Sequence, residues 1–105
     1  MLNKLYKKIM KDIDKCYRKD QWVVRTYKNV VTMVTVMDTS DQVTFYLEMF
    51  YEGVQYRVMS SSDGFATLWR DNDMLVEYKV DNWYVRTEGM FQLLVKAALE
   101  TCLYK

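Results

Sequence analysis

The sequence predicts an α+β fold in which an antiparallel β-meander of about five to seven strands is flanked by an N-terminal and a C-terminal amphipathic helix. Three observations indicate this fold class. Apolar residues recur every three to four positions near both ends of the chain, they alternate with polar ones between residues 22 and 86, and the turn signals between them are short. Short connections suit antiparallel neighbours, because a parallel crossover needs a dozen or more residues.

The composition is typical of a single folded domain, which we assign to residues 1–105. Half of the residues are hydrophobic, 28% are charged and the formal net charge is +1, so no overall field favours a polyanion. We expect neither a transmembrane segment nor a signal peptide, because no apolar run is long enough and none follows the first lysines. Cys16 and Cys102 lie far apart without a CxxC motif, which favours free thiols in a reducing compartment. We therefore expect a cytoplasmic protein.

Residues 3–19 are predicted to form the first helix, with Asn3 as its N-terminal cap. Its apolar stripe consists of Leu2, Leu5, Tyr6, Ile9, Met10, Ile13, Cys16 and Tyr17. The remaining surface is basic and includes Lys7, Lys8, Lys11 and Lys15. A solvated helix face explains these lysines, and the alternative is a basic ridge that meets an acidic protein or a phosphate backbone.

The strands are predicted from the period-two pattern and from the polar turns that separate them. They lie near residues 22–28, 30–37, 42–51, 54–59, 65–70, 74–80 and 83–86. Asn29 indicates either a turn or a bulge, and a bulge would make 22–37 one long bent strand.

Two two-residue turns, Glu52-Gly53 and Asp81-Asn82, set the register of their hairpins. The first pairs Tyr51 with Val54, Met49 with Tyr56, Leu47 with Val58 and Glu48 with Arg57. The second pairs Val80 with Trp83, Tyr78 with Val85 and Glu77 with Arg86. Each register puts apolar pairs on one face and a pair of opposite charges on the other, which locates the solvent side.

The second helix is predicted over residues 88–103, with Thr87 as a candidate N-terminal cap. Its apolar stripe consists of Met90, Phe91, Leu94, Val95, Ala98, Leu99 and Cys102, and Leu93, Ala97 and Leu103 broaden it. Such a wide stripe indicates a helix that lies across the sheet.

The solvent side of the predicted sheet carries aromatic, methionine and arginine side chains, which are enriched at protein interfaces. They are Tyr46, Phe50, Arg57, Met59, Leu75, Tyr84 and Arg86. Three coverings of this side remain open. One of the two helices covers it if they pack on opposite faces of the sheet; otherwise a protein partner or second copy does, or single-stranded nucleic acid stacks on the aromatic rings.

The absence of histidine excludes Ser-His and Cys-His nucleophile pairs and imidazole metal sites within one chain. Two cysteines also cannot complete a four-cysteine zinc site. We therefore expect no catalytic residue, metal or cofactor. One enzymatic alternative remains, because Glu77-Tyr78-Lys79 with Asp63, Asp71 and Asp73 upstream resembles the metal site of PD-(D/E)xK nucleases.

These observations favour a non-enzymatic binding or inhibitor protein that acts stoichiometrically on a larger protein or nucleoprotein. The chain is very short, lacks motifs and is rich in Tyr, Met and Lys. In this it resembles accessory proteins of phages and mobile elements, including inhibitors of the anti-CRISPR kind, and the resemblance implies occlusion of a larger partner. The expected affinity contacts are Tyr46, Phe50, Arg57, Met59, Tyr84 and Arg86, and Lys7, Lys8, Lys11 and Lys15 are expected to steer the encounter. A structural homo-oligomer is the alternative, and direct nucleic-acid binding is less favoured.

Overall fold

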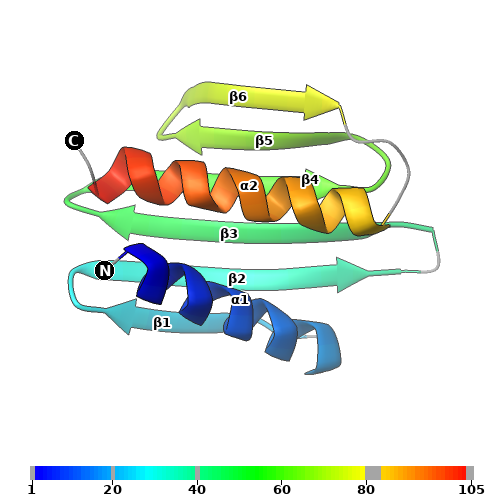
Figure 1. The fold of residues 1–105 in the computed structure, drawn as a ribbon, viewed down its shortest axis with the longest axis horizontal. Helices are drawn as coiled ribbons and strands as arrows, with labels where there is room; N and C mark the ends of the chain where they lie inside the picture. Colours follow the sequence, from blue (N-terminus) through cyan, green and yellow to red (C-terminus); the bar gives the residue numbers. More distant parts are fainter. Residues whose placement is uncertain (1, 20, 40, 80–83, 104–105) are drawn as a thin grey trace.

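The computed structural model describes residues 2–19, 21–39, 41–79 and 84–103. Within them one six-stranded antiparallel sheet has the strand order β1-β2-β3-β4-β5-β6, and a helix lies at each end of the chain (Figure 1). The elements are α1 (Leu2–Lys19), β1 (Val23–Tyr27), β2 (Val30–Asp38), β3 (Val43–Tyr51), β4 (Val54–Ser61), β5 (Phe65–Arg70), β6 (Asp73–Lys79) and α2 (Tyr84–Leu103). The predicted α+β fold with a meander between two helices is therefore confirmed.

Both helices pack on the same side of the sheet, and Figure 1 shows them together in front of the strands. α1 contacts β1 and β2, α2 contacts β3, β4 and β5, and the two helices also contact each other. We call the side under the helices the inner face and the opposite side the outer face. Helices on opposite faces, one of the coverings considered for the sheet, are therefore not what the chain forms.

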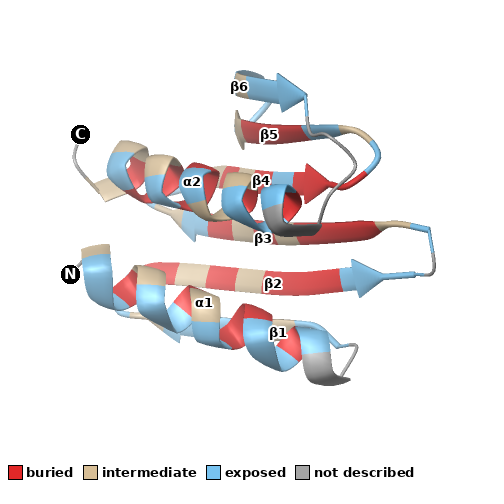
Figure 2. Cartoon of the chain, turned by 45° about the vertical axis from the view of Figure 1, so that its right-hand side comes forward, coloured by how far each residue is buried: buried red, intermediate tan, exposed pale blue. Residues whose placement is uncertain are grey.

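The inner face is apolar because the residues that alternate toward the helices are hydrophobic. One such residue from each strand lines up across the sheet in a continuous row. This row consists of Val23, Val34, Leu47, Val58, Leu68 and Val76. Phe45 on β3 lies beside it and contacts Phe91 of α2 with ring centroids 5.5 Å apart. The buried residues lie on the central strands and on the parts of both helices that face the sheet (Figure 2).

The first helix follows the prediction, and its apolar stripe is directed toward the sheet. Leu5, Ile9, Ile13 and Cys16 are fully buried. The Cys16 thiol donates a hydrogen bond to the Val34 carbonyl at 3.4 Å, and burial raises the thiol pKa. Cys16 and Cys102 are both buried and neither is part of a disulfide, as expected. The predicted Asn3 cap is wrong, because α1 already begins at Leu2.

The first predicted hairpin is confirmed residue by residue. Glu48 lies opposite Arg57, and the other expected pairs around the Glu52-Gly53 turn are also present. Glu52 and Gly53 both have positive φ, 51° and 77°, as a two-residue hairpin turn requires for the right-handed twist of its strands. Asn29 belongs to a turn as well, since β1 ends at Tyr27 and β2 begins at Val30. The alternative of one bent strand over 22–37 is wrong.

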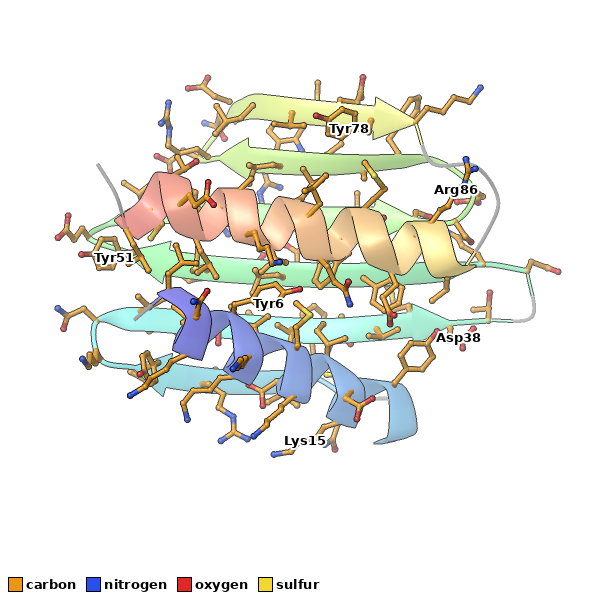
Figure 3. All side chains as sticks on the ribbon, viewed as in Figure 1. Tyr6, Lys15, Asp38, Tyr51, Tyr78 and Arg86 are labelled. Atoms are coloured by element: carbon orange, nitrogen blue, oxygen red, sulfur yellow. The ribbon has the colours of Figure 1, made fainter. Side chains whose placement is uncertain are left out.

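The second predicted hairpin is wrong, because α2 begins at Tyr84. The described part of 83–86 is therefore helical, Arg86 lies on α2 (Figure 3), and Glu77 pairs with Thr67 of β5. The expected turn at Asp81-Asn82 and the pair of Val80 with Trp83 lie outside the described residues.

The predicted cap at Thr87 is also wrong, because Thr87 is a buried residue inside α2. Its carbonyl accepts a hydrogen bond from the Ser60 hydroxyl of β4 at 2.8 Å, and Ser60 is itself fully buried. A polar contact in the core thus attaches the beginning of α2 to the sheet. Local β-branched and aromatic content around residues 83–85 favoured a strand, and this tertiary packing overrides it.

Candidate interaction surface

The outer face is built from the strand residues that alternate with the apolar inner row. One cross-strand row on it consists of Val24, Met33, Glu48, Arg57, Trp69 and Met74. The neighbouring row consists of Thr35, Tyr46, Met59, Thr67 and Glu77. Neither described helix packs on this face, so its apolar side chains stay at the surface.

Four of the expected contact residues come together on the two central strands. Tyr46 lies opposite Met59, and Arg57 lies two pairs further along the hairpin, opposite Glu48. Phe50 follows toward the turn and lies opposite Gln55. Phe50 and Met59 are 41% and 40% exposed, whereas Met49 and Val58, next to them in the chain on the inner face, are fully buried.

Hydrogen bonding and stacking hold the polar groups of this surface in place. The Tyr46 hydroxyl donates to Glu48 Oε1 at 2.6 Å, and burial together with this bond raises the pKa of Tyr46 well above its usual value. The Arg57 guanidinium lies over the Trp69 ring, 5.1 Å from its centroid. Neighbours within the chain therefore orient Tyr46 and Arg57, while Arg57 Nε and Thr67 Oγ1 are buried on this face with no hydrogen-bond partner among the described residues.

Sequence reasoning missed the two tryptophans of this surface. Trp22, which precedes β1, is 52% exposed and contacts the Tyr46 ring edge-on at 5.8 Å. Trp69 lies opposite Arg57 in the register. The sequence could have indicated Trp69. If the alternation of faces in the first hairpin is continued into residues 65–70, Trp69 falls on the same face as Arg57.

The other expected contact residues lie elsewhere. Tyr84 and Arg86 were placed on this surface by the second hairpin; they belong to α2, which packs on the inner face. Leu75 is displaced by an irregularity in the register between β5 and β6. The lysines expected to steer binding lie on α1, across the sheet from the outer face; Lys7, Lys8, Lys11 and Lys15 are all exposed. The aromatic and basic residues therefore form two separate surfaces.

Replacing Tyr46 with phenylalanine is expected to lower the free energy of unfolding by about 1–2 kcal/mol, because its hydrogen bond to the Glu48 carboxylate is lost. The raised pKa of Tyr46 keeps it protonated when an unfolded tyrosine ionises. Wild-type stability should therefore fall as the pH rises above about 10, and the variant should lose less. Urea unfolding at pH 8 and pH 10.5 measures both effects.

Tyr56→Phe is the matched control, because the Tyr56 hydroxyl is buried on the inner face with no hydrogen-bond partner among the described residues. Its removal should leave stability unchanged or raise it. Equal losses in Tyr46→Phe and Tyr56→Phe would contradict the assigned role of the Tyr46–Glu48 bond.

The residues of the nuclease alternative do not gather into a metal site in the described structure. Glu77 and Lys79 are exposed on β6, while Asp71 is a turn residue whose Oδ1 accepts the Gln55 backbone N–H at 3.1 Å. Among the described residues, no group of three or more Cys, Asp or Glu side chains could hold a metal ion. In the same part of the chain, neither helix is long and apolar enough to cross a membrane.

Comparison of the chain with protein-family models, with curated proteins and with solved structures finds no match. The candidate surface is therefore defined by geometry alone.

Proposed function

We propose that this chain is a non-enzymatic protein that binds a larger protein or nucleoprotein stoichiometrically through its outer face and occludes the surface it covers. One observation carries the proposal. Both helices pack on the inner face, while Phe50 and Met59 remain 41% and 40% exposed on the central strands of the outer face. The solvated face of an antiparallel sheet ordinarily carries polar side chains at such positions. Here exposed apolar side chains lie on either side of the Glu48–Arg57 pair, and exposed apolar surface rimmed by polar residues is typical of an interaction site.

The size of the outer face supports a specific interface. Six strands of five to nine residues each present an area of roughly 700 Å² at ordinary strand spacing and rise. This area is close to the ~800 Å² that each partner contributes to a standard protein interface.

The side chains of this face supply the kinds of contact that dominate binding energy. Phe50 and Trp22 are exposed aromatic anchors, and aromatic residues and arginine are the types enriched at hot spots. Because Arg57 already lies over the Trp69 ring, binding orders it at a smaller entropic cost. Occlusion by such a surface requires no catalytic group on the chain.

The proposed partner class follows from the character of the chain. Very short, motif-poor proteins rich in Tyr, Met and Lys resemble phage and mobile-element accessory proteins, and this resemblance supports a component of a bacterial defence system as the partner. The chain would then act as an inhibitor of the anti-CRISPR kind.

A homodimer through the same face is the second candidate, and the charge balance of the face favours it. Its strands carry Glu48 and Glu77 together with Arg57 and Lys79, so two copies would not repel each other. Stacking two outer faces would bury both sheets in a sandwich with the helices outside.

Charge substitution at the centre of the outer face tests the proposal. Phe50→Glu and Met59→Glu should each abolish capture of a specific partner from a lysate of the native host, because a buried unpaired carboxylate opposes docking. Leu93→Glu is the matched control, since Leu93 is 54% exposed on α2, away from the outer face. Affinity capture with mass spectrometry measures the loss, and circular dichroism checks that each variant is folded.

Light scattering separates the two candidates. The homodimer predicts a doubled mass that depends on concentration and disappears in Phe50→Glu without any partner. If Phe50→Glu retains both its partner and its mass, the outer face does not carry the function. If it unfolds, Phe50 contributes to the core and the proposal is wrong.

A further inference from the structure

A basic cleft lies between α1 and β1, on the side of the sheet away from the outer face. It has a volume of ≈ 130 Å³ and is lined by Lys8, Lys11, Asp12, Lys15 and Arg25. The three lysines follow each other at helical spacings of three and four residues, and Arg25 reaches the cleft from β1 because it alternates with Val23 and Tyr27 on the inner face. We call this site the α1–β1 cleft.

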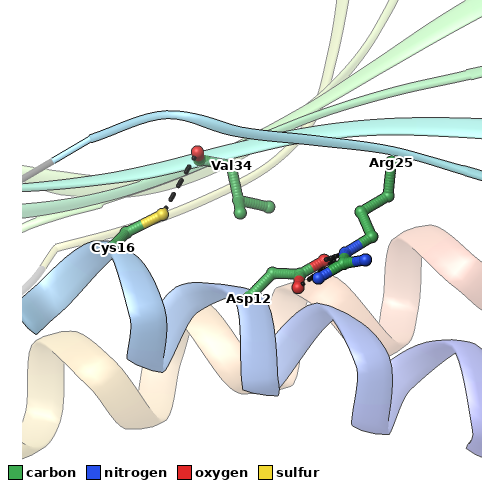
Figure 4. Close-up of polar contacts among 4 residues, drawn as sticks. All are labelled: Asp12, Cys16, Arg25 and Val34. Atoms are coloured by element: carbon green, nitrogen blue, oxygen red, sulfur yellow. Dashed lines mark hydrogen bonds and ion pairs between the residues drawn. The ribbon is translucent and has the colours of Figure 1, made fainter. Parts of the chain in front are cut away.

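An ion pair between Asp12 and Arg25, two of the lining residues, is half-buried in the α1–β1 cleft (Figure 4). Asp12 is only 3% exposed, and its two carboxylate oxygens accept from Arg25 Nε at 2.9 and 3.1 Å. The side chain of Arg25, by contrast, is 49% exposed. Asp12 therefore holds the guanidinium by its Nε edge and orients a group that is still accessible from solvent.

The charges that line the α1–β1 cleft are strongly unbalanced. Its lining holds four cationic side chains and Asp12 as the one carboxylate, which leaves a net charge of +3 within about one Debye length. The chain as a whole has a formal net charge of only +1. This concentration of positive charge is local, and an anion placed in the cleft would relieve the mutual repulsion of the lysines.

We propose that the α1–β1 cleft binds phosphate groups of a nucleic-acid backbone. Phosphate offers acceptor oxygens in several directions, which suits cations that approach from a helix and from a strand, and an oriented guanidinium is the preferred partner for such a group. The cleft is small, so it accommodates a phosphate group and not a whole nucleotide.

The row of cations that contains the cleft extends beyond it, which favours a polymer over a free ion. Lys4, Lys8, Lys11 and Lys15 are all exposed, and their spacing places them in one line along α1 over about 16 Å. Regularly spaced cations match a regularly charged backbone. Trp22, the exposed tryptophan of the outer face, lies on the other side of the sheet. Binding at the cleft therefore involves contacts with the phosphate backbone and not with the bases.

This site is independent of the proposed function, because the cleft and the outer face lie on opposite sides of the sheet. Both can be occupied at once, and the chain would then connect a protein partner to nucleic acid.

Fluorescence anisotropy of a labelled 20-nucleotide oligodeoxythymidylate tests the proposal on the full chain. If the four lysines of the row along α1 neutralise one phosphate each, affinity should fall about 50-fold between 50 and 200 mM salt. Lys11→Glu should weaken binding at least about tenfold at fixed salt. Lys79→Glu is the matched control, since it makes the same charge change at an exposed position on β6, and it should change affinity by less than about threefold.

A second measurement follows Arg25 directly and does not depend on the oligonucleotide. In ¹⁵N-labelled protein, inorganic phosphate should shift the Arg25 Nε–H resonance in the wild type and not in Lys11→Glu, whose fold circular dichroism confirms. The proposal is overturned if the wild type does not bind the oligonucleotide, or if Lys11→Glu and Lys79→Glu weaken it equally. It is also overturned if polyglutamate competes as well as oligodeoxythymidylate, because the cleft then does not distinguish phosphate from carboxylate.

Discussion

Phe45→Ala is expected to lower the free energy of unfolding by about 3–5 kcal/mol, whereas Phe50→Ala on the same strand should lower it by less than about 1 kcal/mol. Phe45 is 1% exposed and contacts Tyr17 of α1 and Phe91 of α2, with ring centroids 5.7 and 5.5 Å away. Its removal leaves a cavity where both helices meet the sheet. Phe50 is 41% exposed on the outer face, so its truncation removes little buried area.

Urea unfolding monitored by circular dichroism measures both substitutions under one protocol. Because the two residues have the same side chain and lie on the same strand, the effect of strand propensity largely cancels in the comparison. The difference between the two losses of stability then measures how much more deeply the inner face is buried than the outer face. A cost for Phe50→Ala as large as that for Phe45→Ala would mean that the outer face is covered within the chain or by a second copy. Repeating the measurement at several protein concentrations distinguishes the two, since only a dimer's stability depends on concentration.

The register of the central hairpin was predictable because local chemistry and burial agree there. Glu52-Gly53 supplies the two positive φ values of the turn. With the turn placed, one register directs Leu47 and Val58 to the core and Glu48 and Arg57 to the opposite face, and a slip of one residue would exchange the two faces. Where the turn residues and the burial pattern indicate the same register, the register can be predicted from the sequence.

The segment after β6 was misread because its short-range pattern is ambiguous. Residues 83–85 are aromatic and β-branched, and a short run of this kind fits a strand or the first turn of a buried helix. What decides is the contact between Ser60 and the Thr87 carbonyl, which joins residues far apart in sequence. No local rule contains that information.

The sequence also could not predict that both helices pack on the same face of the sheet. An apolar stripe shows that a helix buries one side, but not which face of the sheet it covers. Alternation in β3 gives two partly apolar sides, with Phe45 on one and Tyr46 and Phe50 on the other. The register of the first hairpin assigns the apolar pairs to the core side, but whether a helix also covers the other side is decided only once both helices are placed.

The pair of Asp12 and Arg25 left a signal in the sequence that was not used. Asp12 follows Leu5 and Ile9 at helical spacing, so it lies on the buried stripe of α1. Arg25 takes an inward position on β1. Two opposite charges at core-facing positions of adjacent elements indicate that they meet, because a buried charge is retained only when it is paired. The missing information was which strand lies under α1.

The second large effect that we expect is that removing Arg25 lowers the free energy of unfolding much more than removing Asp12. Arg25→Ala should lower the free energy of unfolding by about 2–4 kcal/mol, because it leaves the Asp12 carboxylate buried without its partner. Asp12→Ala should cost about 1 kcal/mol, since the Arg25 side chain is 49% exposed and remains solvated. Removing both should cost less than the sum of the single losses by about 1–3 kcal/mol.

A double-mutant cycle by chemical denaturation measures this coupling, with Arg25→Lys as the variant that keeps the charge but not the planar fork. If the pair orders the α1–β1 cleft as well as the fold, Arg25→Lys should retain most of the stability and still lose phosphate affinity, because an ammonium cannot hold Asp12 by one edge and present another. Additive losses in the cycle would show instead that Asp12 and Arg25 act separately. The oriented guanidinium of the cleft would then lose its physical basis, even if the lysines of α1 still attracted a polyanion.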